Sequence, residues 1–262
     1  VSIASVTGGG YHGVVLKRDG SLWATGLGGS GQLGYGWGID TTVFTESVPS
    51  SITAIAAGHR HTIFLKSDGS LWAVGINSDG QLGDGTASNQ KLPVQIVSSG
   101  VSQISAFKFT SAFVKTDGSL WGTGRGFQGQ LGINPAGNSD LFVKILDGGV
   151  KSLHPIGGQN SLFTKSDETL WGMGMNASGE LGDGTTTQRD TPIQLWASSV
   201  TKASGSYHTI FLETNGTLRG MGKNTNGQLG DGTTADKTTP IIIFGSGVAD
   251  FAAGVNHTLV LK

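Results

Sequence analysis

Residues 58–86 read GHRHTIFLKSDGSLWAVGINSDGQLGDGT, and this stretch decides the fold. Two short apolar runs flank Asp68-Gly69, and Asp-Gly between apolar runs is a strong β-hairpin signal because both residues can adopt positive φ. The motif Gly-Gln-Leu-Gly, once replaced by Gly-Glu-Leu-Gly, recurs from Gly31, Gly80, Gly129, Gly179 and Gly227. Its successive spacings of 49, 49, 50 and 48 residues indicate a chain built of repeats.

Three further motifs keep this period. The hairpin dipeptide stands at Asp19-Gly20, Asp68-Gly69, Asp117-Gly118, Asp167-Glu168 and Asn215-Gly216, and Glu168 predicts a strained or different turn. A tryptophan follows at Trp23, Trp72, Trp121 and Trp171, with Arg219 in the fifth position. A histidine position precedes the dipeptide in six copies: His12, His61, Thr110, Asn160, His208 and His257. We expect these tryptophans to pack between repeats and these histidines to serve the fold.

Each repeat predicts four short strands, which in the second repeat cover residues 52–56, 62–66, 70–74 and 94–97. No segment has a capped helical period of useful length. Four-stranded units of about 50 residues repeated around a ring form a β-propeller, so we predict an all-β, single-domain propeller over residues 1–262. The expected repeats are 1–50, 51–100, 101–149, 150–199, 200–247 and a partial 248–262. Five blades are favoured, while a six-bladed ring and an incomplete ring also fit the strand count.

The composition argues against several classes of function. A net charge of −1 and only 13% charged residues argue against binding nucleic acid through bulk charge. The absence of cysteine excludes thiolate nucleophiles and cysteine-ligated zinc. No apolar run approaches the roughly 18–20 residues that span a bilayer. The chain starts at Val1 without an initiator methionine, so we expect a mature form or an excised piece.

No motif predicts catalysis, a metal or a cofactor. The glycine-rich motif lacks the Lys-Ser/Thr ending of a phosphate loop and recurs in every repeat, which favours a structural role. His59 and His61 share one face of a strand, but no acidic residue accompanies them. Asp79 and Asp84 faintly resemble a calcium loop, yet Asx turns at Asp84 and its counterparts explain them better. We therefore predict no catalytic residue, no metal ligand and no cofactor.

The combined pattern is Gly-x-x-His-Thr, then Lys-x-Asp-Gly-Ser-Leu-Trp, then Gly-x-Asn-x-x-Gly-Gln-Leu-Gly-Asp-Gly-Thr, and residues 58–86 match it almost completely. It resembles the repeat of the regulator-of-chromosome-condensation family over nearly the whole chain. The third repeat departs from the pattern at residues 107–110 and 133–135. The resemblance implies a propeller, usually seven-bladed, that binds proteins through one face. Family members include a nucleotide-exchange factor for a small GTPase, domains of ubiquitin ligases, a plant photoreceptor and bacterial β-lactamase inhibitors.

Some positions occupy the same place in every repeat but hold different residues, and we call each such place an address. Because these residues do not maintain the repeat, they are free for recognition. The residue before the repeated histidine is such an address, and we expect its six copies to lie on one face: Tyr11, Arg60, Phe109, Gln159, Tyr207 and Asn256. Tyrosine, phenylalanine and arginine suit an interface. Phe127 varies at a second address, and with Phe107, Phe109 and Arg125 it makes the third repeat aromatic; a degenerate blade is the alternative. Trp37 lies in an irregular insert over residues 35–50, and it and Trp196 are expected to be exposed.

These features predict a non-catalytic, protein-binding propeller of the adaptor, scaffold or inhibitor type. A carbohydrate-binding or carbohydrate-cleaving propeller that uses exposed aromatic residues is the alternative, with a polysaccharide as its partner. A guanine-nucleotide exchange role ranks third. Low charge with many glycine, serine and threonine residues favours, weakly, a bacterial domain that is secreted or held at the cell surface.

Overall fold

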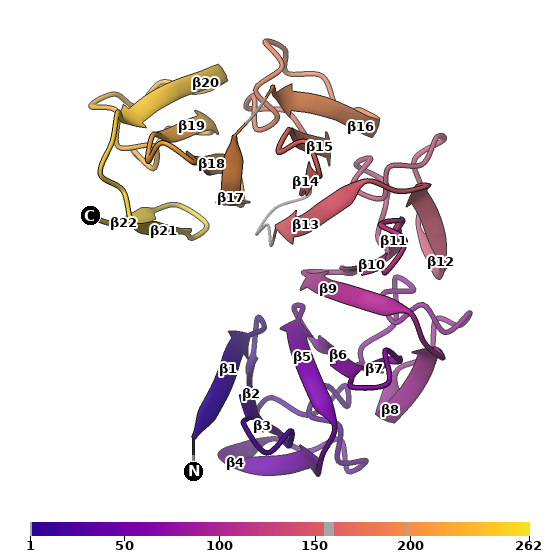
Figure 1. Ribbon diagram of the computed structural model, residues 1–262. Helices are drawn as coiled ribbons and strands as arrows, with labels where there is room; N and C mark the ends of the chain where they lie inside the picture. Colours follow the sequence, from indigo (N-terminus) through magenta and orange to yellow (C-terminus); the bar gives the residue numbers. More distant parts are fainter. Residues whose placement is uncertain (1, 155–159, 198) are drawn as a thin grey trace. The chain divides into compact units, whose positions relative to one another are not determined.

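The computed structural model describes residues 2–154, 160–197 and 199–262, and it is built of β-strands (Figure 1). Five four-stranded antiparallel sheets follow one another along the chain, and a two-stranded sheet comes last. In each full sheet the strands lie in chain order, as in β1-β2-β3-β4. The described residues contain no helix, and therefore none that could cross a membrane. The all-β prediction of five full repeats and a partial one is confirmed.

Each full sheet takes four consecutive strands of the chain. In the second repeat β8 begins a few residues earlier than predicted, because Gln90 already pairs with Gly75 at the end of β7. Grouped by sheet, the strands are β1 Ile3–Gly8, β2 His12–Lys17, β3 Leu22–Gly26, β4 Thr41–Val48; β5 Ile52–Ala57, β6 His61–Lys66, β7 Leu71–Gly75, β8 Gln90–Val97; β9 Val101–Phe107, β10 Thr110–Lys115, β11 Leu120–Gly124, β12 Ser139–Leu146; β13 Val150–His154, β14 Asn160–Lys165, β15 Leu170–Gly174, β16 Arg189–Trp196; β17 Val200–Gly205, β18 His208–Glu213, β19 Leu218–Gly222, β20 Lys237–Phe244; β21 Asp250–Ala253, β22 Thr258–Leu261.

The turn between the second and third strands forms as its dipeptide predicts. Gly69 adopts φ +77°, and the Asp68 carboxylate accepts hydrogen bonds from the Ser70 amide at 2.9 Å and the Ser70 hydroxyl at 2.6 Å. Glu168 occupies the glycine position of the fourth repeat with φ +63°. A side chain in this left-handed region is strained, so the predicted strain at Glu168 is confirmed.

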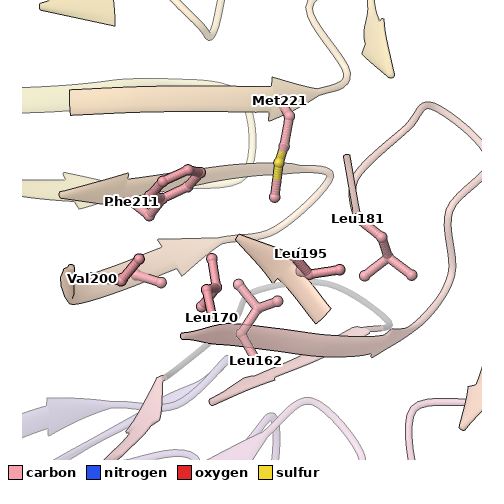
Figure 2. Packing of buried hydrophobic residues seen from close by; sticks show 8 residues of the cluster. Leu162, Leu170, Leu181, Leu195, Val200, Phe211 and Met221 are labelled. Atoms are coloured by element: carbon pink, nitrogen blue, oxygen red, sulfur yellow. The ribbon is translucent and has the colours of Figure 1, made fainter. Parts of the chain in front are cut away.

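The chain divides into two compact units. Unit 1 comprises Val1–Arg125 and Asn138–Gly148, and unit 2 comprises Gly126–Gly137 and Gly149–Lys262. The hydrophobic core of each unit lies between successive sheets. Figure 2 shows this packing in unit 2, where Leu162 and Leu170 of one sheet meet Val200, Phe211 and Met221 of the next. Burial of these side chains is the main force that holds neighbouring sheets together.

The repeated histidines join neighbouring sheets through the same three-group chain. In unit 1 the His12 Nε2 atom lies 2.9 Å from the Thr62 hydroxyl, which donates to the Gln32 carbonyl at 2.9 Å. In unit 2 the His208 Nε2 atom lies 2.9 Å from the Thr258 hydroxyl, which donates to the Gln228 carbonyl at 2.8 Å. The structural role predicted for the histidines is therefore confirmed at these positions.

The repeated tryptophans lie half-buried beside the cores between sheets, as Trp72 and Trp121 do in unit 1. The prediction that Trp196 is exposed is wrong. Its ring packs 5.5 Å from Phe211, and the Arg219 guanidinium lies over it at 4.4 Å. Arg219 replaces the fifth repeated tryptophan, and Trp196 from the preceding repeat provides the aromatic surface that the arginine lacks.

Candidate functional site

The candidate site lies in unit 1, where each loop that joins a first strand to a second strand presents one predicted recognition residue. Tyr11 precedes β2, Arg60 precedes β6 and Phe109 precedes β10. The Asp-Gly turns join the second strand to the third, so they lie at the opposite end of each sheet. The three predicted residues therefore lie at one end of their sheets, as the repeat pattern requires.

Each of these loops is held to the end of the third strand of its own sheet. The carbonyl of Tyr11 accepts a hydrogen bond from the Leu27 amide at 2.9 Å, and that of Arg60 accepts one from the Ile76 amide at 2.8 Å. The carbonyl of Phe109 accepts one from the Arg125 amide at 2.9 Å. Because the strands are rigid, these bonds hold the backbone of all three loops in place.

Neighbouring loops are also bonded to one another. The Gly10 amide donates to the His59 carbonyl at 3.1 Å, and the His59 amide donates to the Lys108 carbonyl at 2.9 Å. His59 thus connects the loop of the first sheet to the loop of the third. Gly10 permits this arrangement, because a Cβ atom there would lie 2.2 Å from the His59 Cδ2 atom.

The rings of Tyr11, His59 and Phe109 form a continuous aromatic contact. The His59 ring centroid lies 4.9 Å from that of Tyr11 with an interplanar angle of 63°, and 5.4 Å from that of Phe109 with an angle of 70°. Both are edge-to-face geometries, which aromatic pairs favour. Tyr11 remains 51% exposed, so the group is open to a partner.

Two arginines flank these rings. The Arg60 guanidinium carbon lies 4.8 Å from the centroid of Tyr11, and that of Arg125 lies 5.6 Å from the centroid of Phe109. Both distances are within the range of cation–π attraction. We call Arg60, Tyr11, His59, Phe109 and Arg125 the cationic aromatic row.

The row contains two positively charged side chains, those of Arg60 and Arg125. The pKa of His59 is lowered by burial first, and then by the charges of Arg60 and Lys108. Within the described residues neither Arg60 nor Arg125 forms an ion pair with a carboxylate. The Arg60 Nε atom is buried without a hydrogen-bond partner in the described part of the chain.

In unit 2 the same address carries a similar pair. Lys223 lies over the Tyr207 ring at 5.5 Å, and the Lys223 amide donates to the Tyr207 carbonyl at 2.9 Å. Asn256 is exposed before β22. Gln159 lies outside the residues that the structure describes. Phe127 is 63% exposed and belongs to unit 2, whereas Phe109 and Arg125 belong to unit 1.

Trp37 lies in the insert between β3 and β4 of unit 1 and is 75% exposed, as predicted. Ile39 in the same insert is exposed as well, and so are Val43 and Phe44 of β4, a strand that forms within the stretch 35–50 predicted to be irregular. Among the described aromatic rings, no stacking or edge contact joins Trp37 to the cationic aromatic row. Trp37 is therefore a separate exposed apolar position.

Sequence reasoning gave little weight to two members of the row. His59 stands outside the repeated motif, and nothing in the sequence indicated that its ring would lie between Tyr11 and Phe109. Arg125 was noted only as part of an aromatic third repeat. The position after the glycine that ends the third strand varies between repeats as Leu27, Ile76, Arg125, Met175 and Lys223. That variation was the available signal for Arg125 and Lys223.

The row offers aromatic faces and guanidinium groups, which bind ligands but do not form a nucleophile–base pair. Among the described residues no three His, Asp or Glu side chains are grouped to hold a metal. The Asp84 carboxylate accepts hydrogen bonds from the Thr86 amide at 3.0 Å and the Asn77 side chain at 2.9 Å, so its predicted Asx turn is confirmed.

The chain is similar to a known domain family and to several solved structures. The family model of the RCC1-like domain matches residues 1–262. Human WBSCR16 has a similar structure, with 19% identity, 99% of this chain and 86% of that chain covered, and a TM-score of 0.71. Prp20p from Saccharomyces cerevisiae shows 16% identity, coverage of 98% and 82%, and a TM-score of 0.70. Yeast RCC1 (Prp20) with Kap60 bound shows 16% identity, coverage of 98% and 79%, and a TM-score of 0.71. No curated protein sequence matches the chain closely.

Proposed function

Because the chain belongs to the RCC1-like domain family, we propose that it is a non-catalytic module that binds another protein through the loops preceding the second strands. Proteins of this fold include ones that bind proteins: Prp20p has binding properties to Gsp1p and histones, and yeast RCC1 (Prp20) binds Kap60. Fold alone does not determine the partner, so the proposal depends on the site.

The cationic aromatic row is the observation that carries this proposal. Tyrosine and arginine are enriched among the residues that dominate binding energy at interfaces. The backbone hydrogen bonds of Tyr11, His59 and Phe109 hold the row in place before any partner arrives, which lowers the entropy cost of binding. Tyr11, Arg60 and Phe109 are proposed as the centre of the interface.

The remaining predicted residues are proposed as secondary contacts. Tyr207 and Asn256 occupy the same address in unit 2, and Gln159 occupies it in sequence. Phe127 and Trp37 are exposed large hydrophobic side chains, a type that supports protein contacts. Substitution of any one of these residues should weaken binding less than substitution of Tyr11 or Phe109.

Affinity capture from the source organism's lysate and culture medium tests the proposal, with the folded chain as bait. The test variant is Tyr11→Ala/Phe109→Ala. The matched control is Leu92→Ala/Ile242→Ala, which truncates two large exposed side chains on fourth strands. Circular dichroism and thermal melts establish that all three baits are folded.

A protein that the wild type and the control retain but the test variant loses supports the proposal. That protein is then purified, and its dissociation constant is measured for each bait. Equal capture by all three baits contradicts the assignment of the face. Capture of no protein contradicts protein binding, and polysaccharide retention would then be measured.

A further inference from the structure

We propose that the segment of the partner bound by the cationic aromatic row is an acidic peptide, with an apolar or aromatic residue between carboxylates. This inference rests on the proposed function and names the chemistry of its partner. In the row the order of groups is Arg60, Tyr11, His59, Phe109, Arg125, so two cations enclose a run of aromatic rings. A complementary segment has carboxylates at both ends of an apolar centre.

The loops that precede the second strands of unit 1 carry positive charge. The loops of the row, residues 9–11, 58–60 and 108–109, carry Arg60 and Lys108 and contain no acidic residue. Asp19, Asp68 and Asp117 lie in the turns at the opposite end. The charges of Arg60 and Arg125, which form no ion pair in the described part of the chain, therefore favour an acidic segment over a basic one.

Four carboxylates of unit 1 follow the third strands at the same end as the row, those of Asp40, Asp79, Asp84 and Asp140, and two of them are engaged by their own loops. The Asp40 carboxylate accepts a hydrogen bond from the Gly28 amide at 2.9 Å. The Asp84 carboxylate accepts hydrogen bonds from Asn77, Thr86 and Gln90. These bonds orient Asp40 and Asp84 toward their own loops, so their charge is not paired with the arginines of the row.

The arginines of the row differ from the paired arginines elsewhere in the chain. Arg189 pairs with Asp183, and Arg219 pairs with Glu213 at 2.8 Å. In contrast, Arg60 and Arg125 are placed by aromatic rings. A guanidinium stacked over a ring keeps its N–H edges free for a carboxylate, which it can bind through two parallel hydrogen bonds.

The row also limits the form of the ligand. Its members come from loops of three successive sheets, so a ligand that touches all of them must cross these loops in an extended form. The rings present faces and edges to an apolar side chain, while Arg60 and Arg125 carry charges that no carboxylate of the described residues pairs. A short acidic peptide provides both kinds of contact.

The test uses a fluorescein-labelled peptide of four Glu-Phe-Glu units and measures its fluorescence polarisation with the full chain. Peptides with Gln or Lys in place of Glu are the matched probes. The test variant is Arg60→Gln/Arg125→Gln, and Arg60→Lys/Arg125→Lys keeps the charge but removes the fork geometry. The control is Arg18→Gln/Lys144→Gln, which removes two positive charges of unit 1 outside the row.

We expect the acidic probe to bind, and the double glutamine variant to weaken that binding about tenfold to a hundredfold. The lysine variant should fall between the glutamine variant and the wild type, and the control should stay within about twofold of the wild type. Binding should weaken as salt rises, since the contacts are ionic. Thermal melts of every variant show whether it is folded.

The inference would be overturned by equal binding of the Glu and Gln probes, or by equal binding of the acidic probe to the wild type and the double glutamine variant. It would also be overturned if the acidic probe did not bind at protein concentrations up to about 1 mM, which corresponds to a Kd weaker than about 1 mM. Equally strong, arginine-dependent binding of a sulfated polysaccharide would also overturn it. Capture of the partner by the two double variants shows whether the acidic ligand alone is wrong or whether the proposed protein binding is wrong as well. If Tyr11→Ala/Phe109→Ala loses the partner but Arg60→Gln/Arg125→Gln keeps it, protein binding stands and the acidic ligand does not.

Discussion

The His61 ring of β6 lies 3.0 Å, through its Nε2 atom, from the Ser111 hydroxyl of β10 in the next sheet. Ser111 uses its one proton to donate to the Gln81 carbonyl at 2.7 Å. The Ser111 oxygen must therefore accept from the His61 Nε2–H group. Burial lowers the pKa of His61 to about 3, so the ring is neutral at pH 7 and carries its proton on Nε2. This relationship joins two sheets of unit 1 and makes the histidine a donor with a defined tautomer.

Replacement of His61 by alanine should destabilise the protein by about 2–4 kcal/mol. The substitution leaves a cavity and removes the hydrogen bond that the Ser111 oxygen accepts from His61 in the neighbouring sheet. His257→Ala is the matched control, since His257 occupies the same motif position but is exposed. That control should change the free energy of unfolding by no more than about 0.5 kcal/mol. Urea denaturation measures both. A similar loss in the two variants would contradict the role assigned to the hydrogen bond.

Stability should fall as the pH drops from 7 to 5. Burial lowers the pKa of His12 and His208 to about 4 and that of His61 to about 3 in the folded protein. The unfolded chain has the ordinary histidine pKa of about 6.5, so below that pH it binds protons that the folded chain does not. Above about pH 6.5 both states of the chain have neutral histidines, so stability is at its full value. At pH 5 each of these histidines lowers the free energy of unfolding by up to about 2 kcal/mol, because it is protonated only in the unfolded chain.

The measurement is the free energy of unfolding in urea at pH 7 and pH 5. His61→Gln is the comparison variant, because glutamine retains an N–H donor but does not titrate in this range. Its loss of stability between the two pH values should be smaller than that of the wild type. An equal loss would show that other groups cause the acid sensitivity.

Gly58→Ala should destabilise unit 1 by about 1–3 kcal/mol, because the added Cβ atom would overlap the His61 ring. The His61 ring packs directly against the Gly58 α-carbon, and a Cβ atom there would lie 2.0 Å from its Cε1 atom. Gly29→Ala is the control, since a Cβ atom there meets nothing within 4 Å. Thermal or urea unfolding distinguishes the two, and equal stability of both variants would contradict the packing described.

Arg219→Trp should destabilise the protein although it restores the residue found in the first four repeats. Arg219 bonds the Glu213 carboxylate at 2.8 Å and lies over Trp196. The substitution leaves buried Glu213 without its cation, a loss of about 1–3 kcal/mol at this partly exposed pair. In Glu213→Gln/Arg219→Trp the isolated charge is removed, so urea unfolding should show a smaller loss. Destabilisation by the double variant as large as by Arg219→Trp would contradict this account.

The strands and turns of this protein could be predicted from its sequence because they depend on local geometry. Asp68-Gly69 predicts its hairpin through backbone conformation, and the alternating apolar residues beside it predict the two strands. Glu168 could be predicted to be strained for the same reason: the turn requires positive φ at that position whichever residue occupies it. Because the motif recurs every 48 to 50 residues, the same hairpin is expected in each repeat, and this predicts a series of sheets.

The positions of Tyr11, Arg60 and Phe109 at one end of their sheets were also determined by the sequence, because the same motif places them before the same strand. Their contacts were decided only by the tertiary structure. His59 lies between Tyr11 and Phe109, and Arg125 reaches Phe109, because side chains of neighbouring sheets meet there. The prediction for Trp196 failed for the same reason, since its burial depends on Phe211 and Arg219 of the next sheet. Motif spacing determines which residues share an address, whereas packing between sheets determines which side chains touch.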